Sequence, residues 1–327
     1  MDKRENNNST DYLQKFSYRK FEGSLEPRWM RVLHLIRFEL VSTWKRSRFG
    51  KILIIIILVL NFAGIVGIAS VAASIVDKEL MRAMLNGFIA SYLSWGDNFI
   101  LPSTEEESLN FSMNLGILLI AAFGIAGSAY FADDKFGKVI EIYLSRLQKK
   151  EYIAGKIMGI ILYINLFLMG PLLAMSILFV QAAEEDHLKY LNFYGGIVFY
   201  CLLTSLILGL FILSLSISVE KRSYASLIFF MTFLFGSIIG AIIALNDIDN
   251  EFLLLISPSN FLTLLAYVCL GDLNLGIFVS FDEIKELDLN NGSGLEYWHI
   301  YLQAIILILI FSTYLAIRIK RMTTEEL

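Results

Sequence analysis

Three kinds of residue in this sequence could do chemistry: histidines, cysteines and clustered carboxylates. The histidines, His34, His187 and His299, lie far apart, and none belongs to an H-E-x-x-H or similar set of metal ligands. The two cysteines, Cys201 and Cys269, have no metal-ligand spacing, so we expect free thiols. These residues therefore predict no metal site.

Two further patterns fall short of a known binding loop. The acidic run at 246–251 (NDIDNE) lacks the Gly and the final Glu of a calcium loop at the required offsets. The three Gly-Lys pairs, at 50–51, 137–138 and 155–156, lack the upstream Gly and the following Ser or Thr of a phosphate-binding loop. We therefore expect no cofactor in this chain.

The elements that carry these residues are predicted to be membrane helices. The 327 residues are 56 % hydrophobic and 18 % charged, with a mean hydropathy of +0.63, which is too apolar for a soluble domain. Spanning a bilayer core takes about 20 apolar residues of helix. Six runs without Asp, Glu, Lys or Arg meet that length, at about 52–76, 113–132, 157–180, 193–217, 224–245 and 298–317. The predicted fold class is an all-α polytopic membrane protein with six transmembrane helices.

The basic residues predict the orientation of these spans. Of the 27 Lys and Arg residues, 23 lie in the segment before the first span, in 133–156, in the turn 218–223 and in the C-terminal tail. The other four, Lys78, Arg82, Lys189 and Lys285, lie in the alternate loops. Because basic loops stay cytoplasmic, both termini are predicted to face the cytoplasm, with the protein in the cell membrane.

The chain before the first span is predicted to have two parts, ahead of a transmembrane domain at 51–327. Residues 1–26 are expected to be a disordered cytoplasmic tail. Residues 27–50 are expected to form an amphipathic helix in the inner headgroup layer, because basic residues accompany an apolar face at helical spacing. That face is Trp29, Leu33, Ile36, Leu40 and Trp44.

Two shorter patterns concern the packing of helices near the outer side of the membrane. Residues 257–269 (SPSNFLTLLAYVC) form an apolar run too short to span, with a Ser-Pro helix start, which predicts a re-entrant or interfacial helix. Gly236 and Gly240 form a small-xxx-small step that lets two helices approach closely. The spacing leaves open whether the partner helix belongs to this chain or to a second copy.

The cytoplasmic segment 133–156 (DDKFGKVIEIYLSRLQKKEYIAGK) has an amphipathic pattern of its own. Its apolar face at helical spacing is Phe136, Ile140, Tyr143, Leu144 and Leu147, and its polar face contains Lys138, Glu141 and Ser145. A short helix along the membrane that contacts a cytosolic protein is one interpretation. A basic loop that only fixes the topology is the alternative.

This segment resembles the cytoplasmic loop of type-2 permeases of ATP-binding-cassette (ABC) exporters. The family pattern is a Gly, an acidic residue, a Leu-Ser-x-Pro stretch, a basic residue, an aromatic residue and Gly-Lys. The matching residues are Gly137, Glu141, Leu144, Ser145, Lys150, Glu151, Tyr152, Gly155 and Lys156, with Leu147 in place of Pro. The resemblance extends to the N-terminal amphipathic helix, the six spans and a Ser-Pro-x-x-Phe element at Ser257, Pro258 and Phe261.

The resemblance implies a transport function with a separate motor. In that family two six-span subunits form the pathway, and the amphipathic helix and the loop helix dock on a cytosolic ATPase that binds ATP and Mg²⁺. It implies a homodimer or heterodimer of permeases, no catalysis in this chain and no nucleic-acid partner. The implied ATPase-coupling residues are Phe136, Gly137, Lys138, Ile140, Glu141, Tyr143, Leu144, Ser145, Arg146, Glu151, Tyr152, Gly155 and Lys156.

Two other functions stay open on the sequence. A secondary transporter would need ionisable groups at depth for proton or sodium coupling, and the spans have none. A membrane scaffold or assembly subunit is compatible with everything above, because nothing in the sequence requires that a substrate moves. An intramembrane enzyme is disfavoured, since no paired carboxylates, Ser/His dyad or metal set converges within the spans.

Overall fold

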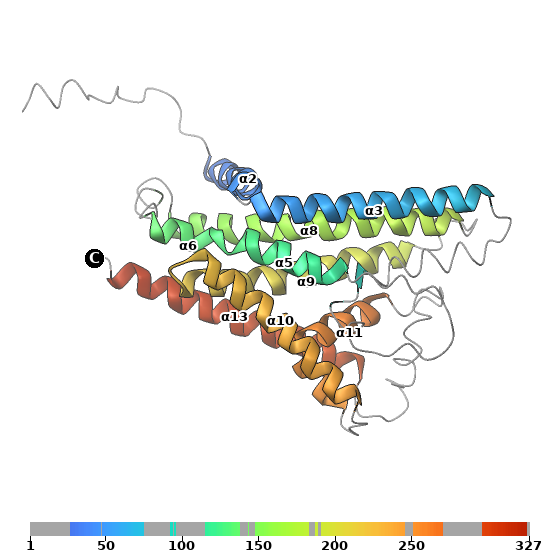
Figure 1. Ribbon diagram of the computed structural model, residues 1–327. Coiled ribbons are helices and arrows are strands. Elements are labelled where there is room, and N and C mark those ends of the chain that lie inside the picture. Colours follow the sequence, from blue (N-terminus) through green and yellow to red (C-terminus); the bar gives the residue numbers. More distant parts are fainter. Residues whose placement is uncertain are drawn as a thin grey trace, which may run out of the picture.

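The chain forms a bundle of long helices (Figure 1). The computed structural model describes residues 27–46, 48–74, 92, 93, 95, 115–137, 143, 148–182, 187, 188, 191–245, 251–270 and 296–325. Within these residues every regular element is helical. In chain order they are α2 (Arg28–Arg46), α3 (Arg48–Ser74), α5 (Leu115–Gly127), α6 (Ala129–Phe136), α8 (Lys149–Ala182), α9 (Leu191–Ser218), α10 (Arg222–Leu245), the 3₁₀ turn η2 (Glu251–Ile256), α11 (Pro258–Leu270) and α13 (Tyr297–Glu325).

The described helices include five to six of spanning length. Five apolar segments are long enough on their own: Leu115–Phe136, Lys149–Leu178, Leu191–Ser218, Arg222–Gly240 and Tyr297–Arg321. The pair α2 and α3, bent by 88°, raises the number to six if it is counted as one crossing. The prediction of an all-helical, multi-pass membrane protein is therefore confirmed. The side on which each end lies stays a prediction.

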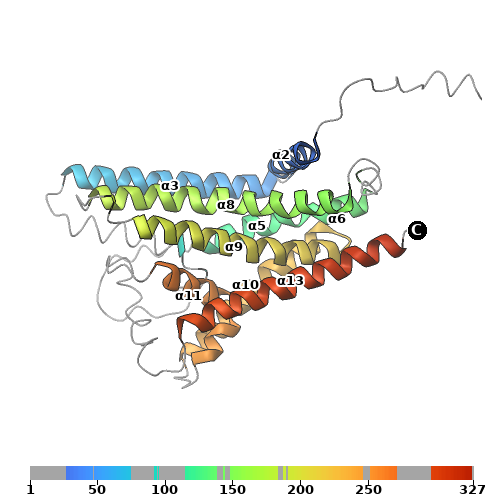
Figure 2. The ribbon, with the colours of Figure 1, turned by 180° about the vertical axis from the view of Figure 1, so that it is seen from behind.

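The helices divide into an enclosed centre and an apolar periphery. The most enclosed helices are α5 and α9, and α9 packs against α8, α13, α11 and α10. The least enclosed span is α13, which presents Ile305, Leu309 and Ile310 on its surface. Large apolar side chains exposed in this way fit a lipid-facing surface. The two views in Figures 1 and 2 show α3 running beside α8 and α13 lying along the bundle.

The structure gathers one set of helix ends at one end of the bundle. In both views α2, the last turn of α6, the start of α8 and the C-terminus lie there, and α11 lies toward the other end (Figures 1 and 2). Two spans also extend beyond their predicted limits at this end. The second continues to Phe136 and the third begins at Lys149, because charged residues stay in the helix after the apolar run has ended.

Helix α2 packs against the bundle on a face that differs from the predicted one. Its buried residues are Leu35, Ile36, Glu39 and Thr43. Of the predicted apolar face, Ile36 is buried, Leu40 and Trp44 are half-buried against the core, and Trp29 and Leu33 are exposed. The ring of Trp44 stacks on Phe167 of α8, with centroids 6.1 Å apart. The helix is therefore rotated so that Glu39 faces α8.

The short apolar run forms a helix at the opposite end. Helix α11 begins at Pro258, and the backbone N–H of Asn260 donates to the Ser257 hydroxyl at 3.3 Å, as in an N-cap. Most of its apolar residues are buried against α10, α9 and α13. A Cβ on Gly236 would lie 2.6 Å from Cδ of Pro258, and one on Gly240 would lie 2.6 Å from Nδ2 of Asn260. The small-xxx-small step thus accommodates a helix of the same chain.

Candidate functional site

A buried lysine joins three helices at the end of the bundle that holds α2. The side chain of Lys156 on α8 is fully buried. Its Nζ lies 2.7 Å from Oε1 of Glu39 on α2 and 2.6 Å from Oδ2 of Asp134 on α6. It also donates to the backbone oxygen of Tyr130 at 2.8 Å. An ammonium has three donors, so these three contacts satisfy it completely.

Aromatic side chains enclose this ammonium. The hydroxyl of Tyr152, one turn before Lys156, donates to Oδ2 of Asp134 at 2.7 Å. The rings of Tyr130, Tyr143 and Tyr152 have their centroids 5.6, 5.9 and 5.5 Å from Nζ, within the range of a cation–π interaction. We call Glu39, Asp134, Tyr152 and Lys156 the junction cluster.

Two glycines let α2 come close enough for this pairing. A Cβ on Gly155 would collide with the side chain of Leu35, and one on Gly159 would lie 3.2 Å from Cβ of Glu39. The contact between α2 and α8 therefore explains why Gly155 is followed by Lys156. The glycine makes room for α2, and the lysine that follows binds its carboxylate.

The energetics of a buried ion cluster favour a positioning role. Removing ions from water costs several kcal/mol each, so such a cluster contributes little net stability, but deleting one partner leaves a buried charge at a cost of about 3–5 kcal/mol. The arrangement therefore penalises any displacement of α2, α6 or α8 that separates the ions. At the surface nearby, Arg222 of α10 lies 3.7 Å from Asp133, and both are solvent-exposed enough for that pair to contribute little.

The predicted coupling residues fall into four groups. Tyr152, Gly155 and Lys156 are buried and bind within the chain, and Tyr143 packs its ring 5.6 Å from that of Tyr152. Phe136 and Gly137 are exposed at the end of α6. Glu151 accepts the backbone N–H of Gln148 at 3.0 Å, which caps the start of α8. Lys138, Ile140, Glu141, Leu144, Ser145 and Arg146 lie outside the described residues.

Sequence reasoning missed the carboxylates of this cluster. Glu39 is the single acidic residue in 27–49, a segment otherwise rich in Arg and Lys. It was assigned no role from the sequence, because only the basic residues were considered beside the apolar face. A lone acid in a basic amphipathic helix, together with a lysine at the start of an apolar run, was the available signal for a buried pair.

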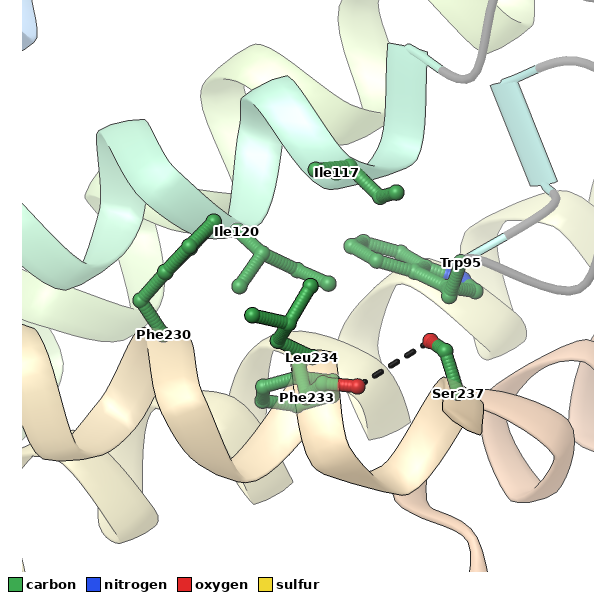
Figure 3. A pocket seen from close by; sticks show the side chains of 7 residues that line it. All are labelled: Trp95, Ile117, Ile120, Phe230, Phe233, Leu234 and Ser237. Carbon is green, nitrogen blue, oxygen red and sulfur yellow. Dashed lines mark hydrogen bonds between the residues drawn. The ribbon is translucent and has the colours of Figure 1, made fainter. Parts of the chain in front are cut away.

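A small crevice lies between α5 and α10 in the described part of the chain. The crevice in Figure 3 is lined by Trp95, Ile117, Ile120, Phe230, Phe233, Leu234 and Ser237. The crevice has a volume of about 10 Å³, about the size needed for a single water. The hydroxyl of Ser237, which lines the crevice, donates to the backbone oxygen of Phe233 at 3.0 Å (Figure 3).

The polar side chains within the spans mostly bond helices to each other or to themselves. Nδ2 of Asn165 lies 3.5 Å from Oγ of Ser205 across the α8–α9 contact, and Nε1 of Trp95 donates to the Tyr200 hydroxyl at 2.7 Å. Asn61 donates to the backbone oxygen of Ile57 in its own helix. Among the described residues, no three His, Cys, Asp or Glu side chains are close enough to hold a metal ion.

The junction cluster is therefore the strongest candidate for a functional site in the described part of the chain. It is a charged, buried junction that joins α2 to α6 and α8, which lie far from α2 in the sequence. Compared with known proteins, the chain matches no family model and no curated protein, so its function is inferred from this geometry and from the sequence, which together identify a multi-pass membrane protein.

Proposed function

We propose that this multi-pass membrane protein is the permease subunit of an ABC exporter. In this proposal it forms a translocation pathway with a second six-span subunit, identical or related. A separate cytosolic ATPase docks on the segment between α6 and α8 and supplies the energy of ATP hydrolysis. Both termini face the cytoplasm, and the protein resides in the cell membrane.

The junction cluster is the observation that carries this proposal. A partner that binds between α6 and α8 acts on the last turn of α6 and the first turns of α8. Lys156 and Asp134 bind each other where these two helices meet, and Glu39 adds α2 to the same unit. A displacement at this end is thus passed to three helices together, as a mechanical coupling element requires.

The charge distribution supports the assignment of this end to the cytoplasm. The basic residues Arg318, Lys320 and Arg321 lie in the last turns of α13, at the end of the bundle that also holds α2 (Figures 1 and 2). Basic residues near the ends of spans favour the cytoplasmic side. An ATPase in the cytosol would therefore meet the end of the bundle that contains the junction cluster.

Co-purification with an ATPase tests this function. The tagged chain is purified from its native membranes in mild detergent, and ATPase activity and subunit composition are measured. We expect a stoichiometric soluble subunit that hydrolyses ATP. Replacing both Glu141 and Arg146 by Ala should reduce that co-purification while leaving membrane insertion intact, and replacing the exposed Lys320 by Ala is the control. A chain that carries no ATPase and functions with both substitutions would contradict the proposal.

One observation favours a second candidate, a proton-coupled secondary transporter. Sequence alone placed no ionisable group within the spans, but Glu39, Asp134 and Lys156 are buried together, and buried carboxylates are the groups that proton relays use. Transport into vesicles separates the two functions. An exporter requires ATP and its partner subunit, whereas the alternative runs on an imposed pH gradient without either.

A further inference from the structure

A hydroxyl group from α9 is inserted into the backbone of the second span. In a regular α-helix the N–H of Phe131 would donate to the carbonyl of Gly127, four residues earlier. Here Oγ of Ser216 accepts the N–H groups of Phe131 and Ala132 at 3.0 and 3.1 Å. The same hydroxyl donates to the oxygen of Ser128 at 2.7 Å. Ser128 separates α5 from α6, and its backbone angles stay in the helical region, at φ −59° and ψ −24°.

The inserted hydroxyl explains why the span is divided. A side chain that enters the i to i−4 ladder separates the two turns that it joins. The two pieces still form one crossing, Leu115–Phe136, so the interruption is local. Ser216 has one proton and two lone pairs, and its contacts with Ser128, Phe131 and Ala132 use all three.

The piece after the interruption is held by other helices. Ser216 bonds α6 to α9, and Lys156 bonds Asp134 and the carbonyl of Tyr130 to α8. Helix α5 is held differently, by close apolar packing. A Cβ on Gly124 would lie 2.8 Å from the ring of Phe229, and one on Gly127 would lie 2.8 Å from Ile212. Of the polar bonds that hold α6, the one to the Ser216 hydroxyl can be exchanged for bonds within the helices.

A second arrangement satisfies the same groups. If the hydroxyl withdraws, the N–H groups of Phe131 and Ala132 can bond the carbonyls of Gly127 and Ser128, as in an uninterrupted helix. The hydroxyl can then donate to the carbonyl four residues before it in α9. Ser214 and Ser218 on the same helix already do so, at 2.7 and 2.6 Å. The N–H groups of Phe131 and Ala132 and the Ser216 hydroxyl therefore have a partner in both arrangements.

We propose that the Ser216 hydroxyl makes residue 128 a two-state hinge in the second span. In the inserted state α6 is bonded to α9. In the withdrawn state α6 is continuous with α5. Because α6 contributes Asp134 to the junction cluster, the state of the hinge sets how that cluster is placed relative to α5. The hinge does not depend on the identity of any partner or substrate.

Distance measurements between spin labels test the hinge. Labels are placed at Phe136 on α6 and Leu202 on α9, both exposed, in protein whose Cys201 and Cys269 have been replaced by Ala. Double electron–electron resonance in lipid nanodiscs should give two distances in this background. S216A should leave only one, because it removes the hydroxyl that holds the inserted state. S216T, which keeps a hydroxyl, should retain both.

The matched control is S218A, on the same helix and two residues away. Its hydroxyl bonds Ser214 of its own helix and Tyr314, so both distances should remain. An S216A distribution identical to that of the labelled background would overturn the hinge. A single narrow distance in the labelled background would overturn it as well, and this measurement needs no substitution at Ser216.

Discussion

Glu39 and Lys156 form an ion pair of 2.7 Å between the N-terminal helix and the start of the third span. Both side chains are almost completely buried, at 1 % and 0 % exposure. Water cannot replace either partner of this pair unless α2 or α8 moves. It therefore fixes the angle at which α2 leaves the bundle.

Replacing Lys156 by Met should destabilise the protein by about 3–5 kcal/mol, because two carboxylates are left buried without their cation. The free energy of unfolding is measured by SDS titration in mixed micelles. K150M is the control, since Lys150 is exposed on the same helix, and it should change stability by less than about 0.5 kcal/mol. Equal effects of the two substitutions would contradict the burial of Lys156.

Replacing Glu39 by Gln should lower the free energy of unfolding. The decrease should be smaller in the K156M variant than in the protein that keeps Lys156. The interaction energy in the cycle of E39Q, K156M and the double variant should be at least about 0.5 kcal/mol, as found for residues in contact. Unfolding in mixed micelles supplies all four values. Strict additivity would mean that the two side chains do not interact in the membrane.

Replacing Gly155 by Ala should destabilise the contact between α2 and α8 by about 1–3 kcal/mol, since the new methyl group meets Leu35 and overpacks the site. Combining it with L35A should recover part of that loss, because the opposing side chain is removed. G195A is the control. Gly195 lies in α9 with no atom within 4 Å of its missing Cβ, so Ala there should be neutral or stabilising, by up to about 1 kcal/mol.

The orientation can be tested by labelling single cysteines in intact cells. In protein without Cys201 and Cys269, a cysteine at Asn291 should react with an impermeant thiol reagent, and one at Lys149 should react only after the cells are opened. We expect this pattern because most basic residues lie on the side that holds Lys149, and basic loops stay cytoplasmic. The reverse pattern would place both termini outside.

The sequence by itself determined which segments become membrane helices. Uncharged runs of about 20 residues have to form helices in lipid, because backbone groups there can pair only within the segment. The start of α11 was equally local, since Ser257 and Pro258 specify a helix N-terminus from their own chemistry. These features depend on residues that are adjacent in the sequence, so they can be predicted without knowing the fold.

Only the tertiary structure decided how the helices face one another. The spacing of Trp29, Leu33 and Ile36 indicated an amphipathic helix, but the rotation of that helix is set by Gly155 and by the charge of Lys156, which belong to another span. The partners of Lys156 and the insertion of Ser216 into the second span are likewise contacts between segments that lie far apart in the sequence. Periodicity describes one helix at a time, whereas close packing and the pairing of buried charges depend on which surfaces meet.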